Sequence, residues 1–290
     1  MAPLAYNLPT DNVAPNATWA EEASGDTAYP ASNVPDFSDL NRGNPGKLTI
    51  ATAGGWTADF GAAQRVDLVV LQHNADVNQP IQVQMNATNS WGSPTMTMTI
   101  TAPAKREDGF TTKLFVDMTK VSGYSASGLR WLRIHFPLIG GSTPNSQNWG
   151  LKVWVGNILR VLDRPLEAEQ VNAEHHTVLK LSTDFGYTWS YDLQTAPRSL
   201  TGRITAIQAT TWPALLSMFR AAAGSAKPMV VIPNPSINDA WIATMTNQQG
   251  SGFSRQGVLE DELPVTAIAP LVMPVPVGWT ELHAGGPEWT

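Results

Sequence analysis

The chain has 290 residues, of which 42% are hydrophobic and only 14% are charged, with a net charge of -6 and no cysteine. The length allows one large domain or two ordinary ones, and the lack of cysteine excludes disulfides, zinc–thiolate centres and thiol nucleophiles. No long Lys/Arg run and no long apolar run is present, so the sequence predicts neither nucleic-acid binding nor membrane insertion.

The first part of the chain reads as an arm followed by a strand-rich domain. Residues 1–27 are polar, rich in Pro, Ala and Asn, and poorly periodic, which predicts an extended N-terminal arm. Residues 28–162 alternate short strands with turn-rich stretches. Strict alternation in Ile81–Met85 and Thr95–Thr101 is typical of sheets with one buried face, and Leu129–Phe136 follows the same pattern. We therefore expect a jelly-roll β-sandwich over 28–162.

The densest group of basic residues lies at the end of this region. Tryptophan and aliphatic residues interrupt the group, which argues against a nucleic-acid surface and predicts exposed strand faces. Its members are Arg130, Arg133, Lys152, Arg160 and Arg164.

A charged stretch around Pro165 marks the boundary to a smaller β-rich domain, predicted over 163–270. One principal α-helix is expected near 212–223, where Pro213 fits the first turn. Its apolar residues recur with the helical period, and they are Trp212, Leu215, Leu216, Phe219 and Ala223. The predicted fold class is thus mainly β: a jelly-roll sandwich followed by a smaller β-rich domain with one principal helix.

No motif predicts a catalytic residue, a cofactor or a metal site. A serine nucleophile elbow is missing. Two carboxylates far apart in the sequence keep a glycoside hydrolase open as an alternative, although the densest acidic cluster, Glu260–Glu262, precedes a strand-like stretch and is typical of solvated charge. Asp36 and Asp39 leave a calcium loop open, without the dense run of oxygen ligands that such loops usually have.

Two tryptophans in polar stretches are candidates for glycan contact. Trp91 follows Asn and Ser residues, and Trp149 follows a stretch that contains Asn145. An aromatic ring with neighbouring amide groups suits a sugar, which has an apolar face and hydroxyl edges. The alternative is that both tryptophans fold back onto the core.

Residues 271–290 predict a second arm, with assembly as its role. The segment contains several prolines, and its apolar residues are spaced as anchors for a neighbouring chain. The candidate interface residues are Val275, Val277, Trp279 and Trp289.

Residues 28–161 resemble the discoidin-like, galactose-binding-like jelly roll. The resemblance rests on Tyr-Pro-x-x-Asn from Tyr29, Trp-x-x-Asp-Phe-Gly from Trp56, Val-Asp-x-Val-x-Leu-x-x-His-Asn from Val66 and Leu-Arg-Trp-Leu-Arg-Ile from Leu129. Further along, an apolar helix at Leu215–Arg220 is followed by a Gly, by Lys-Pro with Val-Val-Ile-Pro from Lys227, and by a short acidic stretch before the last strand. With this pattern, residues 199–269 resemble the second domain of tail-tip proteins of tailed bacteriophages.

The two resemblances together imply a structural virion protein of the tail tip or baseplate, near the distal tail ring and hub, without enzymatic activity. Its implied partners are distal-tail, hub or tail-fibre chains and further copies of itself, as a trimer or hexamer. They imply no cofactor. The alternative is a carbohydrate-binding module that reads host-surface glycans.

Overall fold

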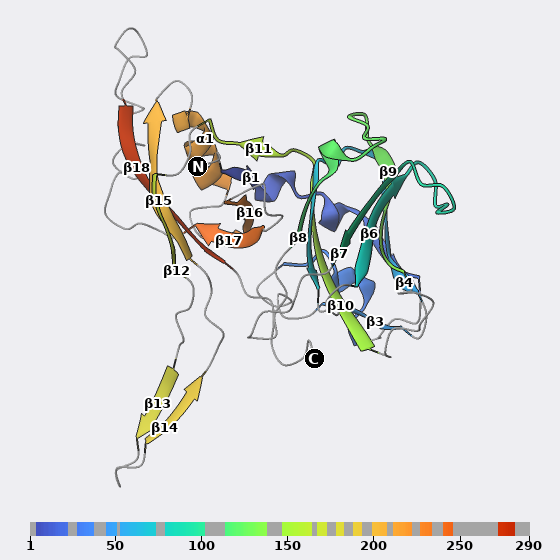
Figure 1. Cartoon of the computed structure of the whole chain (residues 1–290), viewed down its shortest axis with the longest axis horizontal. Helices are drawn as coiled ribbons and strands as arrows, with labels where there is room; N and C mark the ends of the chain where they lie inside the picture. Colours follow the sequence, from blue (N-terminus) through green and yellow to red (C-terminus); the bar gives the residue numbers. More distant parts are fainter. Residues whose placement is uncertain are drawn as a thin grey trace. The chain divides into compact units, whose positions relative to one another are not determined.

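The structure is a computed structural model of the whole chain (Figure 1). It describes residues 4–22, 28–37, 45–50, 53–73, 79–101, 114–137, 147–163, 167–172, 178–182, 188–192, 199–207, 211–221, 227–233, 240–245 and 272–281. Within these ranges, no helix has the length and apolar character needed to cross a membrane.

The chain divides into two compact units. One comprises Met1–Pro9, Val161–Asn234 and Trp241–His283, and the other consists mainly of Thr10–Arg160. The division near residue 160 lies close to the boundary expected at 162, but the first residues of the chain belong to the unit formed by its second half.

The unit over Thr10–Arg160 is a sandwich of two antiparallel sheets. Period-two patterns in the sequence account for both, because alternate side chains of each strand point to opposite faces. One sheet has the order β2 (Thr18–Glu21), β4 (Gly54–Gln64), β9 (Leu129–Phe136), β6 (Pro80–Asn86) and β7 (Met96–Thr101). The other has the order β3 (Gly46–Ile50), β10 (Gln147–Gly156), β5 (Leu68–His73) and β8 (Leu114–Asp117).

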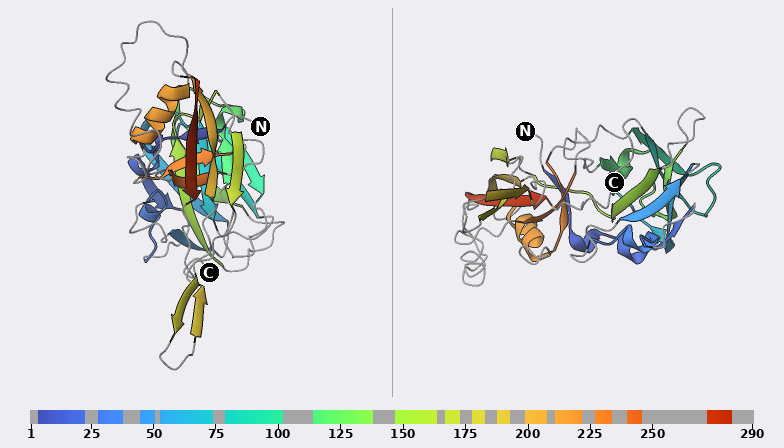
Figure 2. Two further views of the ribbon diagram at one scale, coloured as in Figure 1. Left: turned by 90° about the vertical axis from the view of Figure 1, so that its left-hand side faces the viewer. Right: turned by 90° about the horizontal axis from the view of Figure 1, so that it is seen from below.

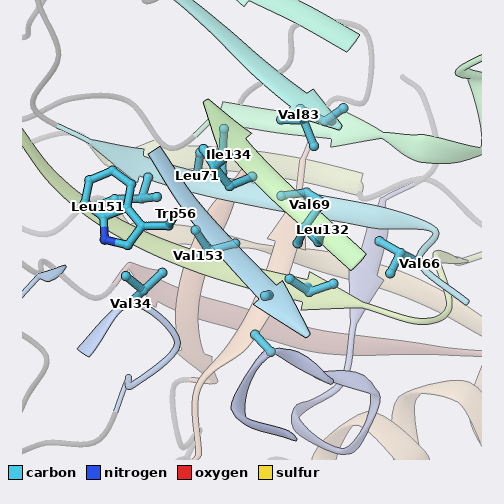
Figure 3. Close-up of a cluster of buried hydrophobic side chains, with 14 of the residues drawn as sticks. Val34, Trp56, Val66, Val69, Leu71, Val83, Leu132, Ile134, Leu151 and Val153 are labelled. Carbon is cyan, nitrogen blue, oxygen red and sulfur yellow. The ribbon is translucent and has the colours of Figure 1, made fainter. Parts of the chain in front are cut away.

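The hydrophobic core lies between these two sheets. Figure 3 shows Trp56, Leu132 and Val83 of the five-stranded sheet with Val69 and Val153 of the four-stranded sheet, and all five side chains are buried. The mainly β fold and the sandwich predicted from the alternation are therefore confirmed.

Asp67 fastens one end of the sandwich. Its carboxylate accepts two hydrogen bonds from the Arg65 guanidinium (2.8 and 2.7 Å) and one from the Tyr124 hydroxyl (2.6 Å). Its backbone N–H donates to Gly156 O (2.9 Å), and its carbonyl accepts from Met118 N (2.9 Å). Burial by itself raises the pKa of Asp67, but the hydrogen bonds from Arg65 and Tyr124 lower it below its ordinary value.

Lys152 does not lie on an exposed strand face, so that prediction is wrong for this member of the basic group. Its side chain is fully buried, because residues 31–37 cover the face of β10 opposite the core. The Lys152 ammonium donates to the carbonyl oxygens of Asn33 (3.2 Å) and Asp36. Beside it the Phe37 and Trp154 rings pack with their centroids 5.8 Å apart.

The other unit is built on a seven-stranded sheet and one α-helix among the described residues. The sheet order is β11 (Arg160–Val161), β1 (Ala5–Asn7), β16 (Met229–Ile232), β17 (Trp241–Met245), β18 (Val272–Glu281), β15 (Ser199–Ile207) and β12 (Glu167–Asn172). A separate hairpin joins β13 (Val178–Ser182) to β14 (Thr188–Asp192).

The helix α1 (Thr211–Ala221) forms where the apolar period predicted it. Its buried face is centred on Leu215 and Met218, which pack in one cluster with Met229 and Val231 of β16. Leu216 is only half-buried, so the stripe points slightly differently from the expected one. At the helix start, the Thr211 hydroxyl hydrogen-bonds to Asp163 Oδ1 (2.7 Å).

The N-terminal segment is not a free arm, and this corrects the sequence-based prediction. β1 pairs with β16, and Leu4, Tyr6 and Leu8 are buried in the cluster that also contains α1. Further along, Trp19 of β2 enters the sandwich core, and its indole N–H donates to Ala14 O (2.9 Å). The strands of this segment are only three and four residues long, so they show too few alternations for a periodic pattern to be recognised.

The C-terminal segment also differs from the arm that the sequence predicted. Residues 272–281 form β18, which pairs with β15 from Ser199↔Thr280 to Ile207↔Val272 and with β17 at 279–281 (Figures 1 and 2). Pro274 and Pro276 lie where β18 is paired with β15 but, among the described residues, not with β17. A strand tolerates proline where one of its sides needs no N–H donor, and this explains how a proline-rich stretch can be a strand.

We expect a chain that ends at residue 270 to lose more than ~4 kcal/mol of unfolding free energy in this unit, because β18 joins β15 to β17. Chemical denaturation followed by far-UV circular dichroism measures the loss. A chain that ends at Glu281 keeps all of β18 and is the control. An unchanged melting temperature after removal of 271–290 would instead support the assembly-arm hypothesis.

Candidate functional site

The outer face of the five-stranded sheet carries a group of polar side chains. In β9, Leu132, Ile134 and Phe136 face the core, so Arg133 and His135 lie on the opposite face. The registers Gln84↔Arg133 and Gln82↔His135 place the amides of β6 next to them. We call Glu22, Gln82, Gln84, Trp91, Arg133 and His135 the polar face.

The Glu22 carboxylate, the Arg133 guanidinium and the His135 imidazole form the centre of the polar face. Arg133 Nε lies 2.6 Å from Glu22 Oε1, and His135 Nδ1 lies 3.3 Å from Glu22 Oε2. All three side chains are largely removed from water: Glu22 is 18% exposed, Arg133 15% and His135 14%. Such partly desolvated contacts are stronger than exposed ion pairs.

Gly55 determines where Glu22 sits. The Glu22 N–H donates to Gly55 O (2.9 Å), immediately after β2 ends. A Cβ atom at Gly55 would come within 2.1 Å of Ile134 O and 3.0 Å of the His135 Cα. Only glycine allows β4 and β9 to approach this closely, and the approach brings the Glu22 carboxylate over Arg133 and His135.

Two glutamines and one tryptophan complete the polar face. Arg133 Nη1 donates to Gln84 Oε1 (3.1 Å), and Gln84 Nε2 donates to Gln82 Oε1 (3.4 Å). Trp91, in the loop between β6 and β7, is half-buried, with its ring centroid 5.5 Å from Arg133 Cζ. Its indole N–H donates to Asn89 Oδ1 (2.8 Å), which fixes the direction of the ring.

The ionisation of Glu22 follows from these contacts. Burial by itself raises the pKa of Glu22, but the hydrogen bonds from His135 and Arg133 and the positive charge of Arg133 outweigh it. The net result is a pKa below the ordinary value, so the carboxylate stays ionised in mildly acidic solution.

A second ion pair lies at the rim of the polar face. Arg130 Nε and Nη2 donate to the two Asp59 oxygens (2.7 and 2.8 Å), and the Arg130 hydrogen bond lowers the pKa of Asp59 to about 2. Asp59 Oδ1 also accepts from Gly61 N (2.8 Å), and Gly61 has φ of 74°. Asp-Phe-Gly at 59–61 thus lies within β4 where its pairing with β9 shifts register, and the positive φ at Gly61 favours glycine. The Arg130 guanidinium lies 5.5 Å from the Trp131 ring.

The residues proposed from the sequence for glycan contact are not all together. Trp91 lies on the polar face, as described above. Trp149 lies within β10 of the other sheet, opposite Leu48, where a loop was expected. Asn145 lies outside the described residues.

Three of the four candidate interface residues lie in β18, and the fourth lies outside the described residues. Val275, Val277 and Trp279 lie in β18, where all three pair with β15 and Trp279 also pairs with Met245 of β17. At least one edge of the strand is therefore already occupied by this chain at each of the three residues. Trp289 lies outside the described residues.

Five members of the polar face were not proposed as site residues from the sequence. Arg133 and His135 were detectable, because the alternation of Leu129–Phe136 puts both on one face. Gln82 and Gln84 follow from the alternation of β6. Glu22 gave no signal, since it is 113 residues from His135 and lies in a segment interpreted as an arm.

The calcium alternative at Asp36 receives no support from the described part of the loop. The Asp36 carbonyl oxygen is hydrogen-bonded by the Lys152 ammonium, and Asp39 is outside the described residues. Among the residues described, no three His, Asp or Glu side chains gather as metal ligands do.

Comparison with known proteins gives similarities to solved structures only. No family model matches the chain, and no curated protein matches it. The lectin domain of lectinolysin, in complex with Lewis B antigen, is 14% identical over 51% of this chain and 98% of its own, with a TM-score of 0.35. The Streptococcus pneumoniae fucose-binding module SpX-3 is 14% identical over 50% and 96%, with a TM-score of 0.34.

A third solved structure covers more of the chain. The f-lectin (fucolectin) from the serum of Morone saxatilis, striped bass, is 10% identical over 69% of this chain and 68% of its own, with a TM-score of 0.37. Because these TM-scores and identities are low, the function must be argued from the side chains of the polar face.

The lowered pKa of Glu22 gives a pH-dependent prediction. A group with a depressed folded-state pKa stabilises the fold above its unfolded-state pKa and loses this contribution as the pH falls through the folded-state pKa. At neutral pH, Glu22→Gln should therefore cost about 1–3 kcal/mol of unfolding free energy. The difference between wild type and variant should shrink once Glu22 is protonated. Urea unfolding at neutral and acidic pH measures it, and a difference that does not change with pH would contradict the ion-pair account.

Proposed function

We propose that the sandwich unit is a carbohydrate-binding module and that its polar face holds the sugar. The observation that supports this most is Trp91, a half-buried ring fixed by Asn89 beside a desolvated group of Glu, Arg, His and Gln side chains. Lectin sites commonly combine one aromatic surface with a few fixed polar groups.

Each part of the polar face has a role in this proposal. The exposed part of the Trp91 ring packs against the C–H face of a sugar ring. Arg133 and Gln82 donate hydrogen bonds to hydroxyl oxygens, and Glu22 and His135 accept from hydroxyl hydrogens. Because Glu22, Arg133 and Gln84 already hold one another in place, little side-chain entropy remains to be lost when the sugar binds.

We propose binding without hydrolysis. Glycoside hydrolysis generally needs two carboxylic groups on either side of the scissile bond, one of them with a raised pKa. The polar face offers Glu22, whose pKa is lowered, and at its rim Asp59, whose pKa is about 2. Neither is suited to be the proton donor, and this supports a module that is not an enzyme.

The test is the loss of glycan binding on removal of the Trp91 ring. We expect Trp91→Ala to weaken binding to an immobilised glycan panel by roughly tenfold to a hundredfold, which corresponds to ~1.4–3 kcal/mol. Met98→Ala, an exposed change on the other face of the same sheet, is the control and should bind normally. Wild-type and Trp91→Ala proteins with equal glycan affinity would refute this site.

A second candidate function is structural, in the tail tip of a tailed bacteriophage. It is supported by the resemblance of residues 199–269 to tail-tip proteins and by β7, the outermost strand of its sheet in the part of the chain described. Exposed edge strands are usually protected by charged residues or proline. Met96–Thr101 contains neither, and so its free edge suits pairing with a strand from a neighbouring subunit.

In this second function, the chain is part of the virion tail tip. Its partners are distal-tail, hub or tail-fibre chains, together with further copies of itself in a trimer or hexamer. The two candidate functions are compatible, because glycan binding uses the outer face of the sheet and assembly uses its edge.

A charge placed on the edge strand tests the assembly function. Met98 is 38% exposed, so Met98→Lys should leave the fold intact while the new ammonium opposes strand pairing. We expect a lower oligomer mass by light scattering and a several-fold loss of incorporation into phage particles. Ala62→Lys adds the same charge at an exposed position away from β7 and should assemble normally. Equal incorporation of both variants would exclude β7 as the interface.

A further inference from the structure

The contacts that Arg133 makes with Glu22 and Gln84 indicate which class of sugar the polar face binds. We propose that the polar face selects neutral sugars with adjacent hydroxyls and discriminates against uronic acids and other carboxylated sugars. This inference rests on the proposed glycan-binding function and adds its chemical specificity.

Arg133 is the natural carboxylate receptor on this face, but its guanidinium is already engaged. An arginine binds a carboxylate best through two parallel N–H donors on one edge. Nε lies 2.6 Å from Glu22 Oε1 in an ion pair, and Nη1 donates to Gln84 Oε1 (3.1 Å). One edge of the guanidinium contains Nε and the other contains Nη1, so each edge already faces an acceptor of this chain. A sugar carboxylate could bind either edge only by breaking one of these contacts.

The charge of the centre also disfavours an acidic ligand. Glu22 neutralises Arg133, and both side chains are mostly removed from water, at 18% and 15% exposure. A sugar carboxylate that reached Arg133 would come next to the Glu22 carboxylate, and like charges at close range are strongly unfavourable where the dielectric constant is low. The protein's net charge of -6 acts in the same direction.

The remaining hydrogen-bonding groups suit hydroxyls. Gln84 donates to Gln82 Oε1, so the Gln82 amide nitrogen remains as a donor for a ligand hydroxyl. His135 has its Nδ1 at Glu22, which leaves Nε2 as the ring's other polar atom. Donors and acceptors thus alternate over a short distance. A hydroxyl both donates and accepts, whereas a carboxylate only accepts, so this set matches a vicinal diol.

Three matched pairs of immobilised glycosides test the inference with the full-length protein. Each pair contains a hexose and its uronic acid: galactose with galacturonic acid, glucose with glucuronic acid, and mannose with mannuronic acid. We expect binding to at least one hexose and at least about tenfold weaker binding to its uronic acid. Preferential binding of the uronic acids would overturn the inference while supporting glycan binding. Binding to none of the six would refute the proposed function itself.

Glu22→Gln separates the local charge from the net charge of the protein. This isosteric change leaves Arg133 without its counter-charge and changes the net charge by only one. We expect the ratio of hexose to uronic-acid affinity to fall by about tenfold, mainly through stronger binding of the uronic acid. Asp59→Asn makes the same change in net charge at the rim and should leave the ratio nearly unchanged. A ratio that falls equally in both variants would show that net charge, and not the Glu22–Arg133 pair, sets the selectivity.

Discussion

The alternation of β9 is the constraint on which the rest of the sandwich depends. Leu132, Ile134 and Phe136 must face the core, because the two sheets have no other way to bury their apolar surface. The same backbone then carries Arg133 and His135 on the opposite face. A shift of one residue in register would bury two ionisable groups and expose three core residues. Core packing therefore holds the polar side chains in place without contacting them.

The sequence predicted local patterns well and long-range partners poorly. Strands in the sandwich, the position of α1 and a division near residue 160 all follow from periodicity and turn residues within short windows. β18 was not predictable as an inner strand, because two prolines argue locally for an extended tail and only the pairing with β15, some seventy residues earlier, makes it a strand. The N-terminal segment was misjudged for the same reason, since its partners lie in the second half of the chain.

Five of the six members of the polar face could be inferred from the sequence, and only Glu22 could not. Arg133 and His135 share a face by strand geometry alone, and Trp91 was recognised from its polar loop. The position of Glu22 depends on how β2 pairs with β4, and no pattern within a short window encodes such a pairing. The chain has few charges, and the structure shows that two of its cations, Lys152 and Arg133, are held by oxygen atoms of this chain. Both would be costly to bury without them.

Gly55 shows that the specificity of a surface can reside in a missing side chain. The residue has no functional group, but its backbone carbonyl holds Glu22 and its lack of a Cβ lets β4 approach β9. A divergent relative could retain every polar residue of this face and still lose the geometry through one added methyl group. Inheritance of the function would then have to be traced through a backbone position that a search for conserved polar chemistry would pass over.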